Sequence, residues 1–240
     1  MSAILRAMAC VLILVVSATG SASENQVKSN EVTAIDILLK PDATMILHAS
    51  NNNARLLKVY PKGFALDATH TPHITLVQRF VRTGDLDKVY AASNAVLARA
   101  KLRSMRLEAF KYYYAPAGAV GVAGIVARPT SELLKLQADI IAAIAPFTVA
   151  TGDSSAFATA PDDPVIDPLL IDYVASFVPK QTGSHFSPHV STGVATKEYL
   201  DRMLSEPFES FTFSPVGAAV YQLGQFGTAA RKLRDLTLHP

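Results

Sequence analysis

Cysteine is almost absent from this chain of 240 residues. Its single cysteine, Cys10, lies near the N-terminus, in a segment that we expect to be removed from the mature protein. A chain without cysteine cannot be a disulfide scaffold, and thiol chemistry and cysteine-ligated zinc are excluded as well. Its stability must come from a hydrophobic core, and roughly 215 residues are enough to build one as a single large domain or as two small lobes.

Runs of charge of one sign are also absent. The chain has 22 lysine and arginine residues against 20 aspartate and glutamate residues, which gives a formal net charge of +2. Long nucleic acids are bound largely through clusters of basic residues, so binding of long DNA or RNA is not expected. A small anionic ligand held by a few local groups is still allowed.

Long apolar runs are limited to the N-terminus. Residues 1–23 contain Arg6, then an apolar run from Ala7 to Ala18 and then small residues, which is the pattern of a secretory signal peptide. The run is short for a spanning helix, which needs about 20 apolar residues, so an uncleaved anchor is the weaker alternative. We therefore expect a secreted, periplasmic protein without a stable membrane anchor. The polar residues 24–32 are expected to form a flexible leader.

The remainder of the chain, from residue 33 to residue 240, alternates between helix and strand patterns. Helical spacing and capping residues predict helices over Asp42–Val59 with a break near Asn51, Asp85–Lys101, Thr130–Ile144, Pro168–Val178, Thr196–Leu204 and Ala229–Leu236. Alternating and β-branched segments predict strands over Thr33–Pro41, His73–Val81, Met105–Pro116, residues 118–127, His189–Ala195 and two more within Phe208–Gly224. The strand pairs at 105–127 and 208–224 are each expected to form a hairpin.

The order of these elements repeats along the chain. A helix, a strand that follows Pro-His, a second helix and a strand pair occur once in about Asp42–Val126 and again in Pro168–Gly224. The order predicts an α+β fold, bilobal, with two pseudo-symmetric lobes of antiparallel strands and flanking helices. The irregular stretch 151–168 is the expected linker between the two lobes of one domain over residues 33–240.

Two of the predicted strands begin with the same short motif. "PHIT" places His73 two residues before Thr75, and "PHVS" places His189 two residues before Ser191. Alternate residues of a strand face the same side, so each imidazole points the same way as its hydroxyl. If the two strands lie side by side about a pseudo-two-fold axis, two imidazoles and two hydroxyls meet in one cleft.

This set of side chains can break a phosphodiester bond without a metal. Histidine titrates near neutrality, so one imidazole can take a proton from water or a ribose hydroxyl while the other protonates the leaving oxygen. The two hydroxyls can bind the non-bridging oxygens and stabilise charge in the transition state. The pseudo-symmetry leaves open which histidine is the base and which is the acid.

The strands "PHITL" and "PHVST" resemble those of the 2H phosphoesterases, which include 2′,5′ RNA ligase-like proteins and cyclic nucleotide phosphodiesterases. The closing segment 219–229 also resembles the end of that family's domain. The resemblance implies a bilobal α+β fold with the cleft between the lobes, His73 and His189 as acid/base pair, Thr75 and Ser191 on the phosphate, and no metal or other cofactor. Thr192 departs from the family pattern, which has an aliphatic residue there, and is expected to face away from the cleft.

We therefore expect a secreted, metal-independent phosphoesterase, monomeric, that cleaves a small phosphodiester such as a 2′,3′-cyclic nucleotide or a short 2′,5′-linked oligonucleotide. Two alternatives stay open. One is a non-catalytic periplasmic protein that binds a phosphorylated ligand in the same cleft. The other is a metal-dependent hydrolase that uses four histidines as ligands, namely His70, His73, His185 and His189.

The other chemistry-bearing residues are expected outside the reaction centre. His70 and His185 are placed at the rim of the cleft or in loops, and His48 and His239 on the surface. Arg79 shares the strand face of His73 but lies six residues along it, so its expected place is the solvated end of the strand. The tyrosines of Lys111–Tyr114 could stack on a base, but a half-buried strand is the commoner setting for them.

Overall fold

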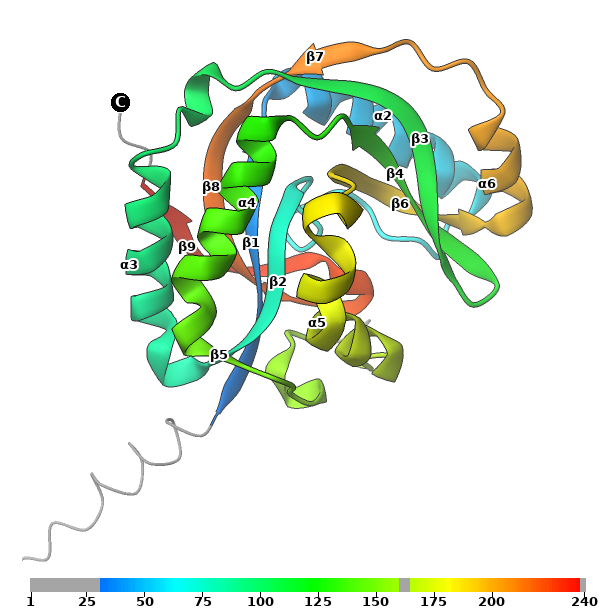
Figure 1. Cartoon of the computed structure of the whole chain (residues 1–240). Coiled ribbons are helices and arrows are strands. Elements are labelled where there is room, and N and C mark those ends of the chain that lie inside the picture. The colour runs from blue at the N-terminus through cyan, green and yellow to red at the C-terminus, as the bar shows by residue number, and fades with distance from the viewer. Residues whose placement is uncertain (1–30, 160–164, 238–240) are drawn as a thin grey trace, which may run out of the picture.

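The computed structural model describes residues 31–159 and 165–237 (Figure 1). The expected signal peptide, most of the leader and His239 lie outside these residues. The helices are α2 (Ala43–Val59), α3 (Leu86–Leu97), α4 (Ser131–Ile144), α5 (Pro168–Gln181) and α6 (Lys197–Leu204). The strands are β1 (Val32–Pro41), β2 (Ile74–Arg82), β3 (Leu107–Ala117), β4 (Val120–Ala127), β5 (Thr148–Val149), β6 (His189–Thr196), β7 (Phe211–Phe213), β8 (Pro215–Leu223) and β9 (Ala229–Leu236).

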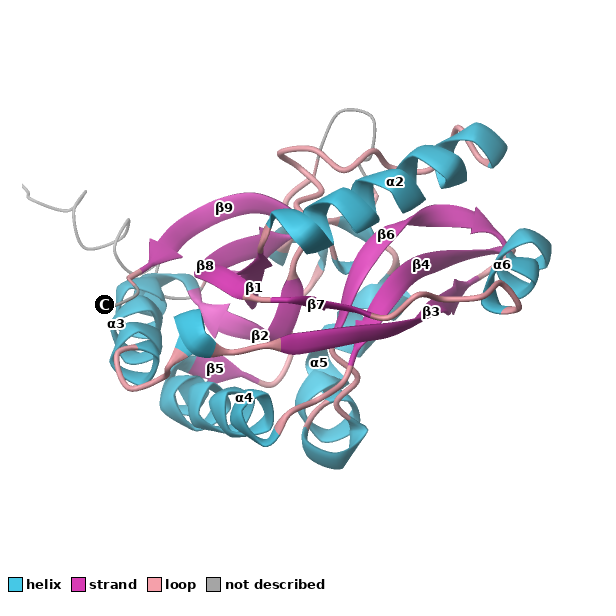
Figure 2. Cartoon of the chain, turned by 90° about the horizontal axis from the view of Figure 1, so that it is seen from above, coloured by secondary structure: helices cyan, strands magenta, loops and turns pink. Residues whose placement is uncertain are grey.

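The strands form two antiparallel sheets, which confirms the α+β fold class. One sheet has five strands in the order β5-β2-β1-β8-β9, and the other has four in the order β6-β4-β3-β7. Helices α4 and α5 pack against β2 of the five-stranded sheet, and α3 lies between α4 and β9. Helices α2 and α6 cover the four-stranded sheet, as the view in Figure 2 shows.

Strand β1 runs through the centre of the five-stranded sheet and is buried along almost its whole length. Ile35, Ile37 and Leu39 belong to the main core together with residues of β2, α3, α4 and the four-stranded sheet, whereas Ala34 and Leu38 belong to smaller buried clusters. Asp36, in the middle of this strand, is a charged residue with no exposed surface. A buried carboxylate is costly unless it has partners, so its contacts are the first place to look for function.

Two sequence predictions about the C-terminal part of the chain were wrong. Residues 229–236 form strand β9 rather than a helix, because pairing with β8 outweighs the helical preference of alanine, lysine, arginine and leucine. Strands β7 and β8 do not form a hairpin, because β7 pairs with β3 and β8 pairs with β1 and β9. The chain changes sheets at Ser214, whose N–H donates to the Asp42 carboxylate at 2.8 Å.

Two helix boundaries also differ from expectation. Helix α2 is continuous through its three asparagines, because the side chains of Asn52 and Asn53 bond to other segments and not to their own backbone. Helix α5 continues through Pro179 to Gln181, because a proline in the last turn removes only one hydrogen bond of the helix.

The irregular stretch around 151–168 does not divide a first-half sheet from a second-half sheet. Each sheet contains strands from both sides of it. The described ends of the stretch pack on the five-stranded sheet, where Phe157 and Ile166 share a buried cluster with Phe80. Among the residues that the structure describes, no helix is both long and apolar enough to span a membrane.

Candidate active site

The two Pro-His motifs open onto one cavity, although their strands belong to different sheets. His73 directly precedes β2 and His189 is the first residue of β6, and these two strands touch. The side chains of His73, Thr75, His189 and Ser191 all line a cavity of about 400 Å³. The two motif strands therefore do not pair as neighbours in one sheet, but the structure still brings the four predicted side chains together.

Both imidazoles are held by the same hydrogen bond. Nδ1 of His73 lies 2.6 Å from the carbonyl oxygen of Thr71, and Nδ1 of His189 lies 2.7 Å from that of Ser187. A carbonyl only accepts, so Nδ1 carries the hydrogen in each ring and Nε2 is left to exchange a proton. The residue between each carbonyl and its histidine is a proline, whose ring restricts the backbone that sets this geometry.

Asp36 breaks the symmetry between the two histidines. Its Oδ2 lies 3.2 Å from Nε2 of His73 and accepts from the hydroxyl of Thr75 at 2.7 Å and from the amide of Gln78 at 3.2 Å. Sequence reasoning missed this residue, because a single aspartate inside an apolar strand has no motif or period. The one indication in the sequence was that Asp36 is a charged residue within an otherwise apolar strand segment.

His189 has an aromatic neighbour in place of a carboxylate. Its ring centroid lies 4.6 Å from that of Tyr113 on β3, with the planes tilted by 56°. The close packing of Tyr113 on His189 depends on Gly124 of β4. Gly124 pairs with Tyr113 of β3 on one side and with Ser191 of β6 on the other. A Cβ at position 124 would lie 2.6 Å from the Tyr113 ring, so only glycine leaves room for it.

The two environments move the pKa values of the histidines in opposite directions. Burial by itself lowers the pKa of His73, but the hydrogen bond to Asp36, the charge of Asp36 and the Thr71 carbonyl together raise it above its usual value. Burial lowers the pKa of His189 below its usual value. The hydrogen bond to the Ser187 carbonyl opposes this in part, the positive charge of His73 lowers the pKa further, and the charge of Asp36 has the smallest, opposing effect. At any given pH near neutrality, His73 is therefore protonated to a larger fraction than His189.

Two tyrosines stand over the cavity as neutral groups. Burial, and then the negative charge of Asp36, raise the pKa of Tyr173 on α5 to about 12. Burial and the nearby Tyr173 raise the pKa of Tyr113 well above its usual value. Tyr113 is the middle one of the three tyrosines for which the sequence favoured a purely structural place, and the structure puts it in the wall of the cavity.

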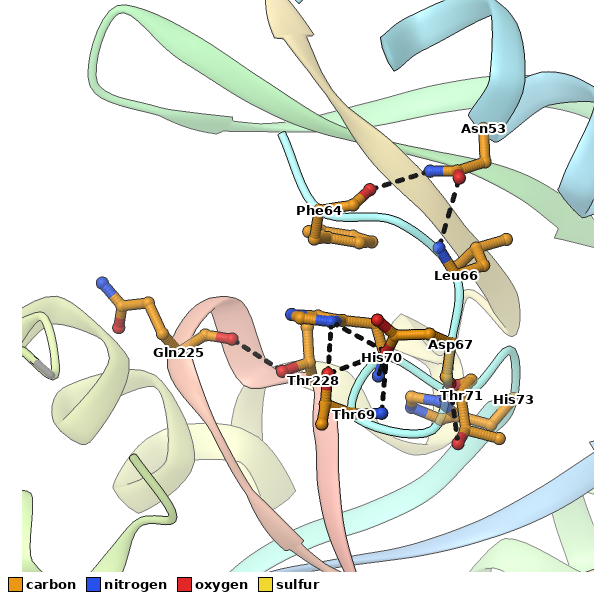
Figure 3. Close-up of polar contacts among 10 residues, drawn as sticks. All are labelled: Asn53, Phe64, Leu66, Asp67, Thr69, His70, Thr71, His73, Gln225 and Thr228. Carbon is orange, nitrogen blue, oxygen red and sulfur yellow. Dashed lines mark hydrogen bonds and ion pairs between the residues drawn. The ribbon is translucent and has the colours of Figure 1, made fainter. Parts of the chain in front are cut away.

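The other histidines do not join His73 and His189 as a set of four ligands. The ring of His70 stacks on Phe64, with centroids 4.7 Å apart, and His70 N–H donates to the Asp67 carboxylate at 3.0 Å (Figure 3). His185 is exposed in the turn Gly183–His185. Over residues 31–159 and 165–237, no group of three or more His, Cys, Asp or Glu side chains could hold a metal ion.

Arg79 lies at the far end of β2, away from the cavity. Its guanidinium donates to the hydroxyl of Thr148 on β5 at 3.3 Å. His48 is exposed on α2 and stacks on Phe211. These residues occupy the places expected for them outside the reaction centre.

Asn53 on α2 ties together the two segments that carry the catalytic candidates. Its side-chain amide donates to the carbonyl of Phe64 at 2.9 Å, and its oxygen accepts from Leu66 N–H (Figure 3). The same amide also donates to the carbonyl of Thr192 at 2.9 Å. Thr192 has no pairing partner where the register of β4 and β6 shifts, and its buried hydroxyl accepts from Asn52 at 2.7 Å. It thus faces away from the cavity, and the aliphatic residue of the family pattern is replaced by a hydrogen-bonded threonine.

Comparison with solved structures finds proteins of similar fold. The structure of TT0787 of Thermus thermophilus aligns with a TM-score of 0.50 and 14% identity over 86% of this chain and 98% of that chain. The chain therefore shares its fold with TT0787. Structures of E. coli LigT complexed with NADP+ (TM-score 0.40, 13% identity) and of Kluyveromyces marxianus Usb1 (TM-score 0.39, 10% identity) each match 86% of this chain and 99% of their own. No protein-family model and no curated protein sequence matches the chain.

Proposed function

We propose that this protein is a secreted, metal-independent phosphoesterase that cleaves small phosphodiesters by two-histidine acid/base catalysis. The substrates proposed are 2′,3′-cyclic nucleotides and short 2′,5′-linked oligonucleotides. The observation that carries the proposal is the matched pair of imidazoles, each tied through Nδ1 to the carbonyl two residues upstream, with Thr75 and Ser191 in the same cavity. The 2H phosphoesterase fold supports it, and the signal-peptide pattern of residues 1–23 supports export.

The asymmetry around Asp36 supports different roles for the two histidines. Neutral His189, with its lowered pKa, is the general base that takes the proton of the attacking water or ribose hydroxyl through Nε2. His73, whose protonated form Asp36 favours, is the general acid: its Nε2–H, which faces Asp36 at 3.2 Å in the structure, turns to the leaving oxygen and is transferred to it. After cleavage the two histidines have exchanged protonation states, and return of the proton through solvent resets the site.

The hydroxyls of Thr75 and Ser191 bind the non-bridging phosphate oxygens. Thr75 donates to Asp36 in the structure, and its hydroxyl hydrogen can rotate towards a phosphate oxygen when substrate enters. Protonated His73 is the positive charge nearest to these hydroxyls, and it is shared between the phosphate and Asp36, whose Oδ2 lies 3.2 Å from Nε2 of His73. Donors placed where negative charge builds up lower the barrier, because they need no reorganisation during the reaction.

The test is turnover of 2′,3′-cyclic nucleotides in the presence of EDTA. Replacing either member of an acid/base pair costs a factor of about 10²–10⁴, so His73→Ala and His189→Ala should each lose that much activity while remaining folded. His185→Ala is the matched control, because His185 is exposed and lies outside the cavity. Full activity in either cavity variant would overturn the acid/base pair. Loss of activity with EDTA would favour a metal-dependent reaction, and binding without turnover would favour a non-catalytic binding protein.

A further inference from the structure

We propose that the cavity selects phosphodiesters that carry a single charged phosphate and a bulky aromatic or apolar ester group, and that it rejects substrates with additional phosphates. The inference rests on the proposed function and narrows it. A 2′,3′-cyclic nucleotide has one phosphate and one aromatic base and fits this class. An oligonucleotide with several phosphates does not.

The charges around the cavity favour one phosphate and no more. Of its described lining residues, none is lysine or arginine. The positive charge available is that of His73, and it is already paired with Asp36. Asp167 adds a negative charge at the start of α5, where its carboxylate accepts from Leu169 N–H at 2.9 Å. A second phosphate would meet this carboxylate without a basic side chain to balance it.

The walls of the cavity are largely apolar and aromatic. Helix α5 contributes Leu169, Leu170, Tyr173 and Phe177, and Tyr113 faces them from β3. Large apolar side chains usually avoid solvent, yet Leu169 is 73% exposed and Tyr173 37% exposed. Exposed apolar groups gathered around one cavity are typical of a binding site, because a ligand can cover them.

Phe226 adds a second, independent indication in the turn Gln225–Gly227, which contacts α5. Its backbone has φ of 59°, a left-handed conformation that a bulky residue rarely adopts, and its side chain is 42% exposed. The turn is held in place by its neighbours, since Gly227 N–H donates to the Gly224 carbonyl at 3.2 Å and the Thr228 hydroxyl donates to the Gln225 carbonyl at 2.9 Å (Figure 3). Strain that is kept in this way is concentrated at ligand-binding sites. Here it presents an aromatic ring to the cavity.

Two matched pairs of substrates test the inference. The first pair is adenosine 2′,3′-cyclic phosphate with and without a 5′-phosphate, which differ only in the added charge. The second pair is the phenyl and methyl diesters of p-nitrophenyl phosphate, which share a leaving group and differ in apolar bulk. We expect kcat/KM to fall at least tenfold on adding the 5′-phosphate and to be at least tenfold higher for the phenyl than for the methyl diester. Equal kcat/KM values within either pair would overturn the inference while leaving the proposed function intact.

Substitutions of cavity-lining residues test which side chains cause the two substrate preferences. Tyr173→Ser and Phe226→Gly should bring the phenyl-to-methyl ratio towards one, and Leu169→Lys should recover at least part of the activity lost on adding the 5′-phosphate. Leu47→Ser is the matched control, because Leu47 is 60% exposed on α2 and is not part of the cavity lining. A control variant that changed the ratio as much as Tyr173→Ser would overturn the assignment.

If no diester is cleaved, the proposed function fails and ligand binding still decides the inference. Calorimetric titration with phenyl phosphate, inorganic phosphate and pyrophosphate separates apolar bulk from added charge. Tighter binding of phenyl phosphate than of the other two supports the selectivity, whereas tighter binding of pyrophosphate, or equal binding of all three, overturns it.

Discussion

Replacing Asp36 with asparagine removes the negative charge beside His73 and keeps the size of the side chain. Oδ2 of this fully buried residue lies 3.2 Å from Nε2 of His73 and accepts from Thr75 at 2.7 Å. A hydrogen bond to a charged group contributes about 1.5–3 kcal/mol, and the loss is limited because His73 can release its proton. We therefore expect the free energy of unfolding of Asp36→Asn to be lower by about 1.5–3 kcal/mol in mildly acidic solution.

The pH dependence of this loss follows from the direction of the pKa change. Burial lowers the pKa of His73, but its hydrogen bond to Asp36 and the charge of Asp36 raise it overall. The stabilisation by the pair is therefore complete below the ordinary histidine pKa of about 6.5 and disappears as the pH rises through the higher pKa of the folded state. Urea unfolding of wild type and Asp36→Asn should differ most below about pH 6.5 and less in alkaline solution.

The same substitution should change the pH profile of kcat/KM on one side only. His73 must be protonated to act as the acid, so loss of Asp36 should move the alkaline limb to lower pH. The acid limb follows deprotonation of His189 and should move much less, because Asp36 is the smallest of the causes acting on the pKa of His189. Proton NMR titration of the two imidazole rings assigns each limb without relying on the rate.

An alkaline limb that stays in place, or a shift of the acid limb instead, would refute His73 as the general acid. Asp167→Asn is the matched control. Its carboxylate also faces the cavity, but it accepts from the backbone N–H of Leu169 and not from a histidine. Both limbs should keep their positions in this variant.

Three further substitutions test the framework of the site. Gly124→Ala places a Cβ 2.6 Å from the Tyr113 ring, so unfolding free energy should fall by about 1–3 kcal/mol and activity at least tenfold. Asn53→Leu leaves the buried carbonyl of Thr192 and the partly buried carbonyl of Phe64 without their donor and should cost about 1–3 kcal/mol or more in total, measured by urea unfolding. Phe226→Gly removes a strained left-handed phenylalanine and should raise the free energy of unfolding by about 1 kcal/mol or more, measured by thermal melting, while activity on aromatic substrates falls.

Each of these expectations has a contrary outcome. A Gly124→Ala protein with normal activity would show that the contact between Tyr113 and His189 is dispensable. An Asn53→Leu protein as stable as wild type would mean that other donors satisfy the two carbonyls. A melting temperature that drops in Phe226→Gly would show that packing of the ring against Phe64 outweighs the backbone strain.

The sequence predicted the parts of the molecule that depend on local pattern. Alternation and the Pro-His motifs located the strands at His73 and His189, and the structure brings their side chains into one cavity. Asp36 could not be found in this way, because its role depends on which strand lies beside β1. Tyr113 was predicted to have only a structural place for a similar reason. Alternation shows that it faces the opposite side of the strand from Tyr112 and Tyr114, but it does not show which of the two sides lines the cavity.

Long-range pairing explains the errors of topology. The composition of residues 229–236 favours a helix. They form a strand because they pair with the edge of β8. The short sequence around Ser214 predicts the turn of a hairpin, but the strands on its two sides, β7 and β8, belong to different sheets. Such a crossover has no signature within a short window of sequence.

The place of β1 between β2 and β8 affects when the protein can become active. Residues 32–41 need residues 215–223 as their second neighbour, so the five-stranded sheet stays incomplete until nearly the whole chain is available. Contacts between such distant residues form slowly, because a long loop must close before they are made. Asp36 and His73 can already meet across the pair β1–β2, but the cavity around them is complete only when residues 187–191 and 225–227 are also in place.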